Sequence, residues 1–288
     1  MKDFSSCLFK LRFLCVLLGL CVAASAQCKF ADLIIPGADT SEAFGINDQG
    51  AIVGAFNTAT TNFRGFLLFQ GKFTHFDFPG ADQTFAEDIN NHGQIVGTYL
   101  AANINPTGFV VHNGVFHSIT APQPPGDTQT RAHAINDFGT IVGEAGQSGF
   151  RLNNGHFTTV SFPGSSSTSA SGINNSGVIV GTYRDATGNI THGFMLKNGH
   201  YTTVDFPGAD NTSVNRINKQ GDIVGFYTMH GDFHSFTLDK GRFMTHDYSA
   251  GFSTDIFGIN KFDTLVGFYG EATGSRGHAF RASCKGVF

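Results

Sequence analysis

Tryptophan is absent from this chain, and charged residues make up only 14% of it. The formal net charge is −4, and no stretch is rich in lysine and arginine. Proteins that bind nucleic acid or anionic lipid need a basic patch, so neither partner is expected. After the first 26 residues no apolar run is long enough to span a bilayer, and we expect no membrane span.

Recognisable catalytic and metal-binding motifs are also missing. The His-Glu-x-x-His zinc motif, the twelve-residue calcium loop and the Gly-x-Ser-x-Gly elbow of hydrolases do not occur. We therefore expect no metal ion, no cofactor and no catalytic residue of these known types. Nothing after the first 26 residues has the 3.6-residue apolar period of a helix, which favours an all-β fold.

The first residues have the features of an export signal. Lys10 and Arg12 precede an apolar run at residues 13–24, and Ala24-Ser25-Ala26 is a small-x-small cleavage site. The alternative, a retained anchor helix, is disfavoured because the run is short. The predicted division is a signal peptide at 1–26 and one domain at 27–288, secreted or held in the periplasm or cell envelope.

A repeated pattern fills the predicted mature chain. Ile-Asn, followed a few residues later by Ile-Val-Gly or a near copy, occurs six times with spacings between 38 and 46 residues. The copies are Ile46-Asn47, Ile89-Asn90, Ile135-Asn136, Ile173-Asn174, Ile217-Asn218 and Ile259-Asn260. In the second unit we predict strands at 84–90, 94–99, 108–112 and 115–120, with a polar loop at 100–107. Asn-x-Gly and Asn-Gly turns join such strands into hairpins.

Four short antiparallel strands per unit of this length are typical of a β-propeller blade. The fourth strand follows only five of the six Ile-Asn copies. The missing one lies at the other end, at 30–36, where Pro36-Gly37-Ala38-Asp39 matches Pro79-Gly80-Ala81-Asp82. The sequence predicts a six-bladed propeller in which the N-terminal strand completes the last blade, and we expect a monomer.

Two cysteines, Cys28 and Cys284, remain after removal of the predicted signal. Alignment of the repeats places them opposite Gly71 and Gln70, which are neighbours in a hairpin turn of the first complete unit. An exported domain with two cysteines favours a disulfide. We predict that Cys28 and Cys284 are bonded in place of the missing turn; two free thiols are the alternative.

The third strand of each unit begins with a further motif. It reads His192-Gly193-Phe194, His234-Ser235-Phe236 and His278-Ala279-Phe280, with weaker copies at Arg64, Thr107 and Ser148. Together with Gly-Ile-Asn and Ile-Val-Gly, this pattern resembles the HAF-type (His-Ala-Phe) extracellular repeat proteins over the whole predicted mature chain. The resemblance implies an extracellular or cell-envelope protein of a bacterium, and it implies no particular activity. The three histidines recur in different blades, too far apart to share one zinc ion, and we expect them to cap or pack the strand.

Charged residues on the first strand of each unit are the candidates for a binding site. Most positions on these strands are small and repetitive, but several are charged or hold histidine, and a repeat scaffold does not require charge there. We expect them to converge on the mouth of the central channel. They are Glu42, Glu87, Asp88, Arg131, His133, Arg216 and Asp255. The alternative is a solvated channel lining with internal ion pairs.

Three functional hypotheses follow from this pattern. The first is a non-catalytic binding or adhesion module of the envelope or extracellular space, contacting a polymer, a protein or a cell-surface ligand. The second is an extracellular polysaccharide hydrolase or lyase using Glu42, Glu87 or Asp255 with Arg131 and His133. The third is a purely structural envelope component. Two carboxylates facing each other across a cleft would favour the enzyme.

Overall fold

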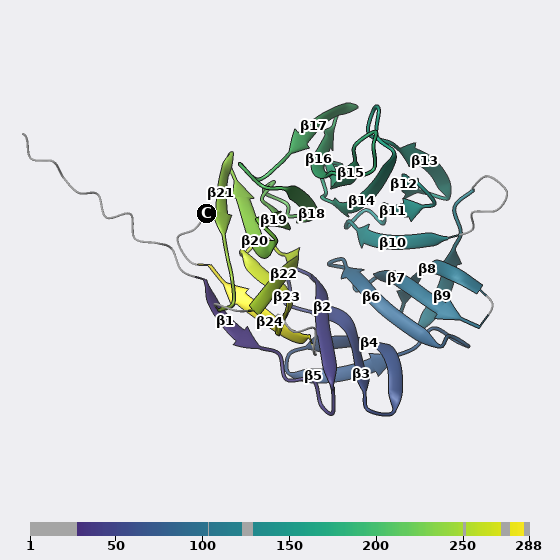
Figure 1. Ribbon diagram of the computed structural model, residues 1–288. Coiled ribbons are helices and arrows are strands. Elements are labelled where there is room, and N and C mark those ends of the chain that lie inside the picture. Colours follow the sequence, from purple (N-terminus) through teal and green to yellow (C-terminus); the bar gives the residue numbers. More distant parts are fainter. Residues whose placement is uncertain (1–27, 103, 123–128, 250–251, 272–276, 285–288) are drawn as a thin grey trace, which may run out of the picture.

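The computed structural model describes residues 28–102, 104–122, 129–249, 252–271 and 277–284. The predicted signal peptide at 1–26 lies outside these residues. Within them every regular element is a strand, and no helix offers a segment that could cross a membrane. The strands form six four-stranded antiparallel sheets arranged as a ring (Figure 1), which confirms the predicted six-bladed propeller.

The first three blades follow the chain in order, each strand pairing with the next. Blade 1 comprises β2 (Thr40–Ile46), β3 (Ile52–Thr58), β4 (Thr61–Phe69) and β5 (Lys72–Phe76). Blade 2 comprises β6 (Gln83–Ile89), β7 (Ile95–Ala101), β8 (Ile104–His112) and β9 (Val115–Ile119). Blade 3 comprises β10 (Thr130–Ile135), β11 (Ile141–Ala145), β12 (Ser148–Asn153) and β13 (His156–Val160).

Blades 4 and 5 repeat this order, and blade 6 is built from both ends of the described chain. Blade 4 comprises β14 (Ser167–Ile173), β15 (Ile179–Arg184), β16 (Thr191–Lys197) and β17 (His200–Val204). Blade 5 comprises β18 (Asn211–Ile217), β19 (Ile223–Met229), β20 (Asp232–Asp239) and β21 (Arg242–Thr245). Blade 6 comprises β22 (Phe252–Ile259), β23 (Thr264–Glu271), β24 (His278–Ser283) and β1 (Lys29–Asp32).

The ring closes in blade 6 as predicted. β1 pairs antiparallel with β24, with Lys29 opposite Ser283 and Asp32 opposite Phe280. A disulfide joins Cys28 to Cys284 next to this pairing, so the predicted bond is also confirmed. Both cysteines are buried in the core of blade 6. The closure gives the last blade the same four strands as its neighbours.

The repeated asparagines explain why Ile-Asn recurs. The Nδ2 of each donates to the backbone carbonyl of the equivalent asparagine in the next blade, at 3.0–3.4 Å, from Asn47 through Asn260 and back to Asn47. The Oδ1 of Asn47 also accepts from the backbone N–H groups of Gln49 and Ala51, which fixes the turn that follows. One residue type therefore holds both the hairpin turn and the contact between blades.

Close packing between the first and third strands explains the glycine of Ile-Val-Gly. A Cβ on Gly54 would lie 1.9 Å from the carbonyl oxygen of Glu42 and 2.7 Å from the ring of Phe66. Phe66 is fully buried, as are its equivalents Phe109, Phe194, Phe236 and Phe280. The repeat thus places one large aromatic residue in the core of each blade against a backbone that only glycine allows.

The predicted loop at 100–107 is wrong for most of its length. β7 and β8 run on to a pair between Ala101 and Ile104. Residues 100–107 mix apolar residues such as Leu100 and Ile104 with Asn, Thr and Pro106 in no regular alternation, so the sequence pattern does not mark them as strand. Pairing of the main chains satisfies the backbone hydrogen bonds whatever the side chains are.

Candidate functional site

The first strand of each blade lies nearest the centre of the ring (Figure 1). Each of these strands carries a one-residue register shift just before its Ile-Asn pair, for example between Ala43 and Gly45. Such a bulge redirects the backbone and the neighbouring side chains. The bulged residues are Phe44, Glu87, His133, Ser171, Asn215 and Phe257.

The position after the bulge is small in four blades and charged in two. Gly45, Ala134, Gly172 and Gly258 occupy it in blades 1, 3, 4 and 6, whereas blades 2 and 5 have Asp88 and Arg216. A Cβ on Gly45 would lie 2.7 Å from the Cα of Asp88, and one on Gly172 would lie 3.0 Å from the Cα of Arg216. Neighbouring strands are therefore in contact here, and little room is left for side chains.

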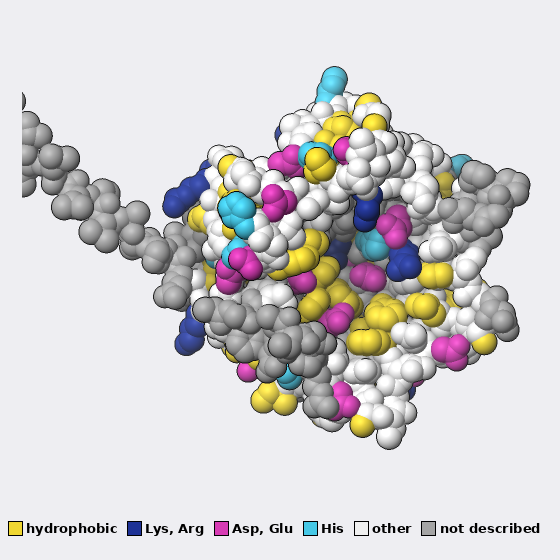
Figure 2. Space-filling view, in the orientation of Figure 1, with side chains coloured by type: hydrophobic (Ala, Val, Ile, Leu, Met, Phe, Trp, Pro, Cys, Tyr) yellow, Lys and Arg dark blue, Asp and Glu magenta, His cyan; other side chains and the backbone are white. Residues whose placement is uncertain are grey.

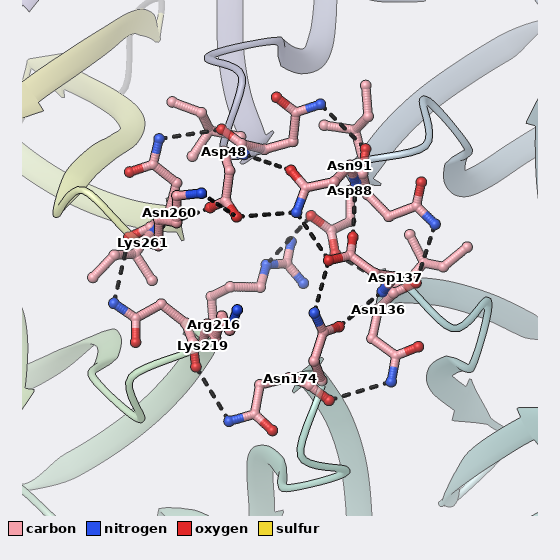
Figure 3. A pocket seen from close by; sticks show the side chains of 18 of the residues that line it. Asp48, Asp88, Asn91, Asn136, Asp137, Asn174, Arg216, Lys219, Asn260 and Lys261 are labelled. Atoms are coloured by element: carbon pink, nitrogen blue, oxygen red, sulfur yellow. Dashed lines mark hydrogen bonds and ion pairs between the residues drawn. The ribbon is translucent and has the colours of Figure 1, made fainter.

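Arg216 reaches across the ring from blade 5 (Figure 3). Its Nη1 donates to the carbonyls of His133, at 2.9 Å, and Ser171; its Nη2 donates to those of Glu87, at 2.9 Å, and Phe44, at 3.3 Å. The acceptors are four of the bulged residues, in blades 3, 4, 2 and 1. The guanidinium thus connects five blades and separates the two ends of the channel.

Asp88 is the charge partner of this guanidinium. Its Oδ1 lies 4.0 Å from Nε of Arg216, and its Oδ2 accepts from the backbone N–H of Ile135 at 3.0 Å. Burial raises the pKa of Asp88, and the nearby Arg216 counteracts part of this rise. Both residues line the cavity at the asparagine end, defined by Asn47 and its five equivalents, and so lie deeper than the predicted mouth position.

The cavity at the asparagine end is small, about 80 Å³. Most of its polar lining is engaged internally, but Nε of Arg216 has no hydrogen-bond partner within the part of the chain that the structure describes. Asn91 donates to Asp48 and Asp137 at 3.0 and 2.9 Å, and Asn175 donates to Asp137 at 2.7 Å. Burial opposes ionisation of Asp137, but hydrogen bonds from Asn175 and Asn91 outweigh it and lower the pKa. These contacts join adjacent blades and have the character of a structural network.

The opposite end, the channel mouth, is hollowed, with acidic, basic, histidine and hydrophobic side chains around the hollow (Figure 2). Five predicted residues belong here, and three of them are carboxylates on adjacent blades: Asp255 in blade 6, Glu42 in blade 1 and Glu87 in blade 2. Burial raises the pKa of Glu42 to about 7, and the charges of Glu87 and Asp255 add to the rise. Burial alone raises the pKa of Asp255 to about 6.

Glu87 links this acidic group to the basic residues of blade 3. Burial raises its pKa, while the charges of His133, Arg216 and Arg131 oppose the rise. Asp255, Glu42 and Glu87 therefore form one electrostatically coupled set, which we call the acidic arc. The arc occupies three consecutive blades on one side of the channel.

The basic residues of the mouth share an acid of their own. Glu144 on β11 lies 3.3 Å from Nε of Arg131 and 3.8 Å from Nε2 of His133. Burial opposes its ionisation, but hydrogen bonds from His133 and Ser169 and the charges of His133 and Arg131 lower the pKa to about 2. Sequence analysis missed Glu144, although the residue after Ile-Val-Gly or its near copy is uncharged in the other five copies.

Aromatic side chains flank the acidic arc. Phe257 contacts Phe44 edge-on with centroids 5.4 Å apart, and it stacks on Phe268 at 5.7 Å. Phe85 lies 5.2 Å from Phe63. The mouth therefore combines carboxylates and an apolar wall on blades 6, 1 and 2 with an internally paired basic group on blade 3.

The histidines of the third strands are structural, as the sequence indicated. His192 contacts Asp205 at 2.7 Å and stacks on Tyr183; His234 contacts Asp247 at 2.9 Å and stacks on Tyr227. Asp77 pairs in the same way with Arg64. The recurring aspartates after the fourth strand thus pair with the start of the third strand of their own blade.

Comparisons with known proteins extend to the fold alone. No protein-family model and no curated sequence matches the chain. Among solved structures, a catalytically inactive virginiamycin B lyase from Staphylococcus aureus with quinupristin has a TM-score of 0.52 at 14% identity, covering 89% of this chain and 99% of that one. A gluconolactonase from Xanthomonas campestris has a TM-score of 0.53 at 10% identity, covering 91% and 92%. TolB from Acinetobacter baumannii has a TM-score of 0.53 at 12% identity, covering 87% of this chain and 65% of that one.

Proposed function

We propose that this protein is a ligand-binding propeller, non-catalytic, with its binding site at the channel mouth. The observation that carries the proposal is the acidic arc of Asp255, Glu42 and Glu87. Burial disfavours ionisation of all three, so holding them together costs folding stability at neutral pH. The positions equivalent to Glu42 and Asp255 hold Ser169 in blade 4 and Ser213 in blade 5, so the scaffold does not require carboxylates there.

The setting that we propose is extracellular or within the cell envelope. The export signal expected at 1–26, the HAF-type resemblance and the disulfide support this location. The partner would be an extracellular polymer, a protein or a cell-surface ligand. The similar propellers named above include a lyase, a gluconolactonase and TolB, so the fold itself is compatible with binding and with catalysis.

A ligand panel tests this proposal. Glycan arrays and a small-molecule thermal-shift screen would be run on the wild type, on Glu42→Ala and Glu87→Ala, and on Asp232→Asn, which removes an exposed carboxylate of β20. We expect ligands that bind wild type and Asp232→Asn and lose affinity for the two mouth variants. Ligands that bind all four proteins equally would place the site elsewhere and refute the proposal.

One observation favours the enzyme alternative. Glu42 and Glu144 occupy the same mouth with pKa values displaced in opposite directions, to about 7 and about 2. A protonated and an ionised carboxylate are the pair that hydrolases and lyases of glycans use. Incubation with polysaccharides and measurement of new reducing or unsaturated ends tests it: activity that Glu42→Gln abolishes would establish catalysis.

A further inference from the structure

The charges of the channel mouth do not cancel. Arg216 lies beside Asp88, and Arg131 pairs with Glu144. Among the described residues, no cationic nitrogen lies within 4.0 Å of a carboxylate oxygen of Glu42, Glu87 or Asp255. The acidic arc therefore presents up to three negative charges for which the protein supplies no ion pair.

Asp255 in particular is a buried acceptor that lacks a donor. Its Oδ1 is inaccessible to solvent and has no hydrogen-bond partner in the described part of the chain. Buried carboxylate oxygens without a donor are rare, because the lost hydration is not replaced. Asp255 shares its strand position with Glu42, and the two charges interact across the boundary between blades 6 and 1. Because Oδ1 is closed to solvent, a donor that enters from the mouth would bind Oδ2 of Asp255 and the carboxylate of Glu42.

The spacing of the carboxylates argues against a metal ion as that donor. Ligands of one ion at 2.0–2.6 Å lie within about 5 Å of one another. In the described residues the group of three that comes within 4.8 Å consists of Cys28, His246 and Cys284, and it does not include the acidic arc. The three carboxylates of the arc therefore cannot all ligate one ion, whereas a cation with several N–H donors can bind two of them and be attracted by the third.

The aromatic residues beside the arc indicate what kind of group is attached to the bound cation. Phe257 follows Asp255 by two positions, Phe44 follows Glu42 by two, and the two rings are in contact. Phe268 extends this wall. Rings beside carboxylates stabilise ammonium groups and cover the attached carbon atoms.

We infer that the channel mouth binds a primary organic ammonium with an apolar or aromatic substituent. The ammonium group donates to Oδ2 of Asp255 and to Glu42, and Glu87 adds to the attraction. Phe257, which contacts the buried Phe44, and Phe268 cover the substituent. This inference rests on the proposed function, since it names the ligand class of the same site.

Calorimetric titration with 2-phenylethylammonium tests the inference, with the uncharged 2-phenylethanol as the matched probe. We expect one site per chain with a Kd of about 0.1–1 mM for the amine, and binding at least about tenfold weaker for the alcohol. Asp255→Asn and Glu42→Gln should each weaken amine binding about tenfold. Asp232→Asn, on the exposed hairpin of blade 5, should leave the affinity unchanged.

Three outcomes would overturn the inference: no binding of the amine, equal binding of the alcohol, or unchanged affinity in Asp255→Asn. Asp255→Asn and Glu42→Gln should remain folded, because each removes a buried charge whose ionisation costs stability. Their melting temperatures check that they are folded. If the amine fails while another ligand class from the panel depends on Glu42 and Glu87, the ligand class is wrong and the proposed site stands.

Discussion

The residues that distinguish this ring from an ideal repeat lie on its innermost strands. Arg216 and Asp88 stand where four other blades have glycine or alanine, so the sequence marks both as exceptional. It does not reveal that the guanidinium binds four backbone carbonyls, because those acceptors become available through bulges in four separate strands. The residues of the mouth were predictable by position, but their division into a paired basic group and an unpaired acidic arc depends on distances between blades.

Replacing Glu42 with glutamine should stabilise the protein in a pH-dependent manner. The pKa of Glu42 is about 7 in the folded state, above its ordinary 4.5, so its contribution to stability is present below pH 4.5 and lost as pH rises through 7. Thermal unfolding should show Glu42→Gln more stable than wild type by about 1–3 kcal/mol at pH 8, and nearly no difference at pH 4.5. A gain of equal size at both values would mean that Glu42 is not buried as a charge.

His246 should make the protein sensitive to acid. It is buried against Cys28, with Nε2 at 2.8 Å from the hydroxyl of Thr237, and burial lowers its pKa to about 4. The pKa of His246 in the folded state lies below its ordinary 6.5. Its contribution to folding stability, up to about 3 kcal/mol, is therefore present above pH 6.5 and lost as the pH falls through 4. Val204 is the equivalent of His246 in blade 4. His246→Val should therefore reduce the fall in unfolding free energy between pH 6.5 and pH 4. An unchanged decline would assign the acid sensitivity to other groups.

At the scale of the elements, turn chemistry and the repeat period were sufficient to predict strands and blades. Glycine in Asn-Gly turns, asparagine in Ile-Asn and phenylalanine on the third strand each recur for a local reason that the structure confirms. The hairpin of β7 and β8 could not be delimited, because its polar residues carry no period. The pairing of Asp77, Asp205 and Asp247 with the third strand could not be predicted either, since aspartates that cap a turn would recur in the same way.

Replacing one asparagine of the Ile-Asn ring should reduce the free energy of unfolding far more than replacing an exposed asparagine. Asn174 accepts two backbone N–H groups of its turn and donates to the carbonyl of Asn218. Asn174→Ala leaves these buried groups unpaired and should cost about 2–4 kcal/mol in chemical denaturation. Asn189→Ala, in an exposed loop, is the matched control and should change the free energy of unfolding by less than about 0.5 kcal/mol. Similar losses in both variants would remove the special role of the asparagine ring.

At the scale of the whole molecule, stability depends on joining the two ends of the chain in blade 6. The disulfide spans 256 positions, and the loop-entropy account assigns such a bond up to about 5 kcal/mol. Its pairing was predictable because the fourth strand missing from the last blade is present at the start of the repeat region, as β1.

Reducing agent should lower the melting temperature of the wild type and expose β1 and β24 to hydrogen exchange before the other strands. The Cys28→Ser/Cys284→Ser protein should melt at the lower temperature with or without the reductant. If reductant leaves the melting temperature of the wild type unchanged and β1 stays protected from hydrogen exchange, strand pairing alone closes the ring.

The central claim is that the ring has one ligand-binding end, because Arg216 closes the channel and the asparagine end is engaged internally. A crystal structure of the protein soaked with 2-phenylethylammonium tests this most directly. The account predicts the ammonium nitrogen between Asp255 and Glu42, with the aromatic ring against Phe257. Density for the amine in the cavity lined by Asp48 and Asp137, or on the outer strands with the mouth empty, would contradict it.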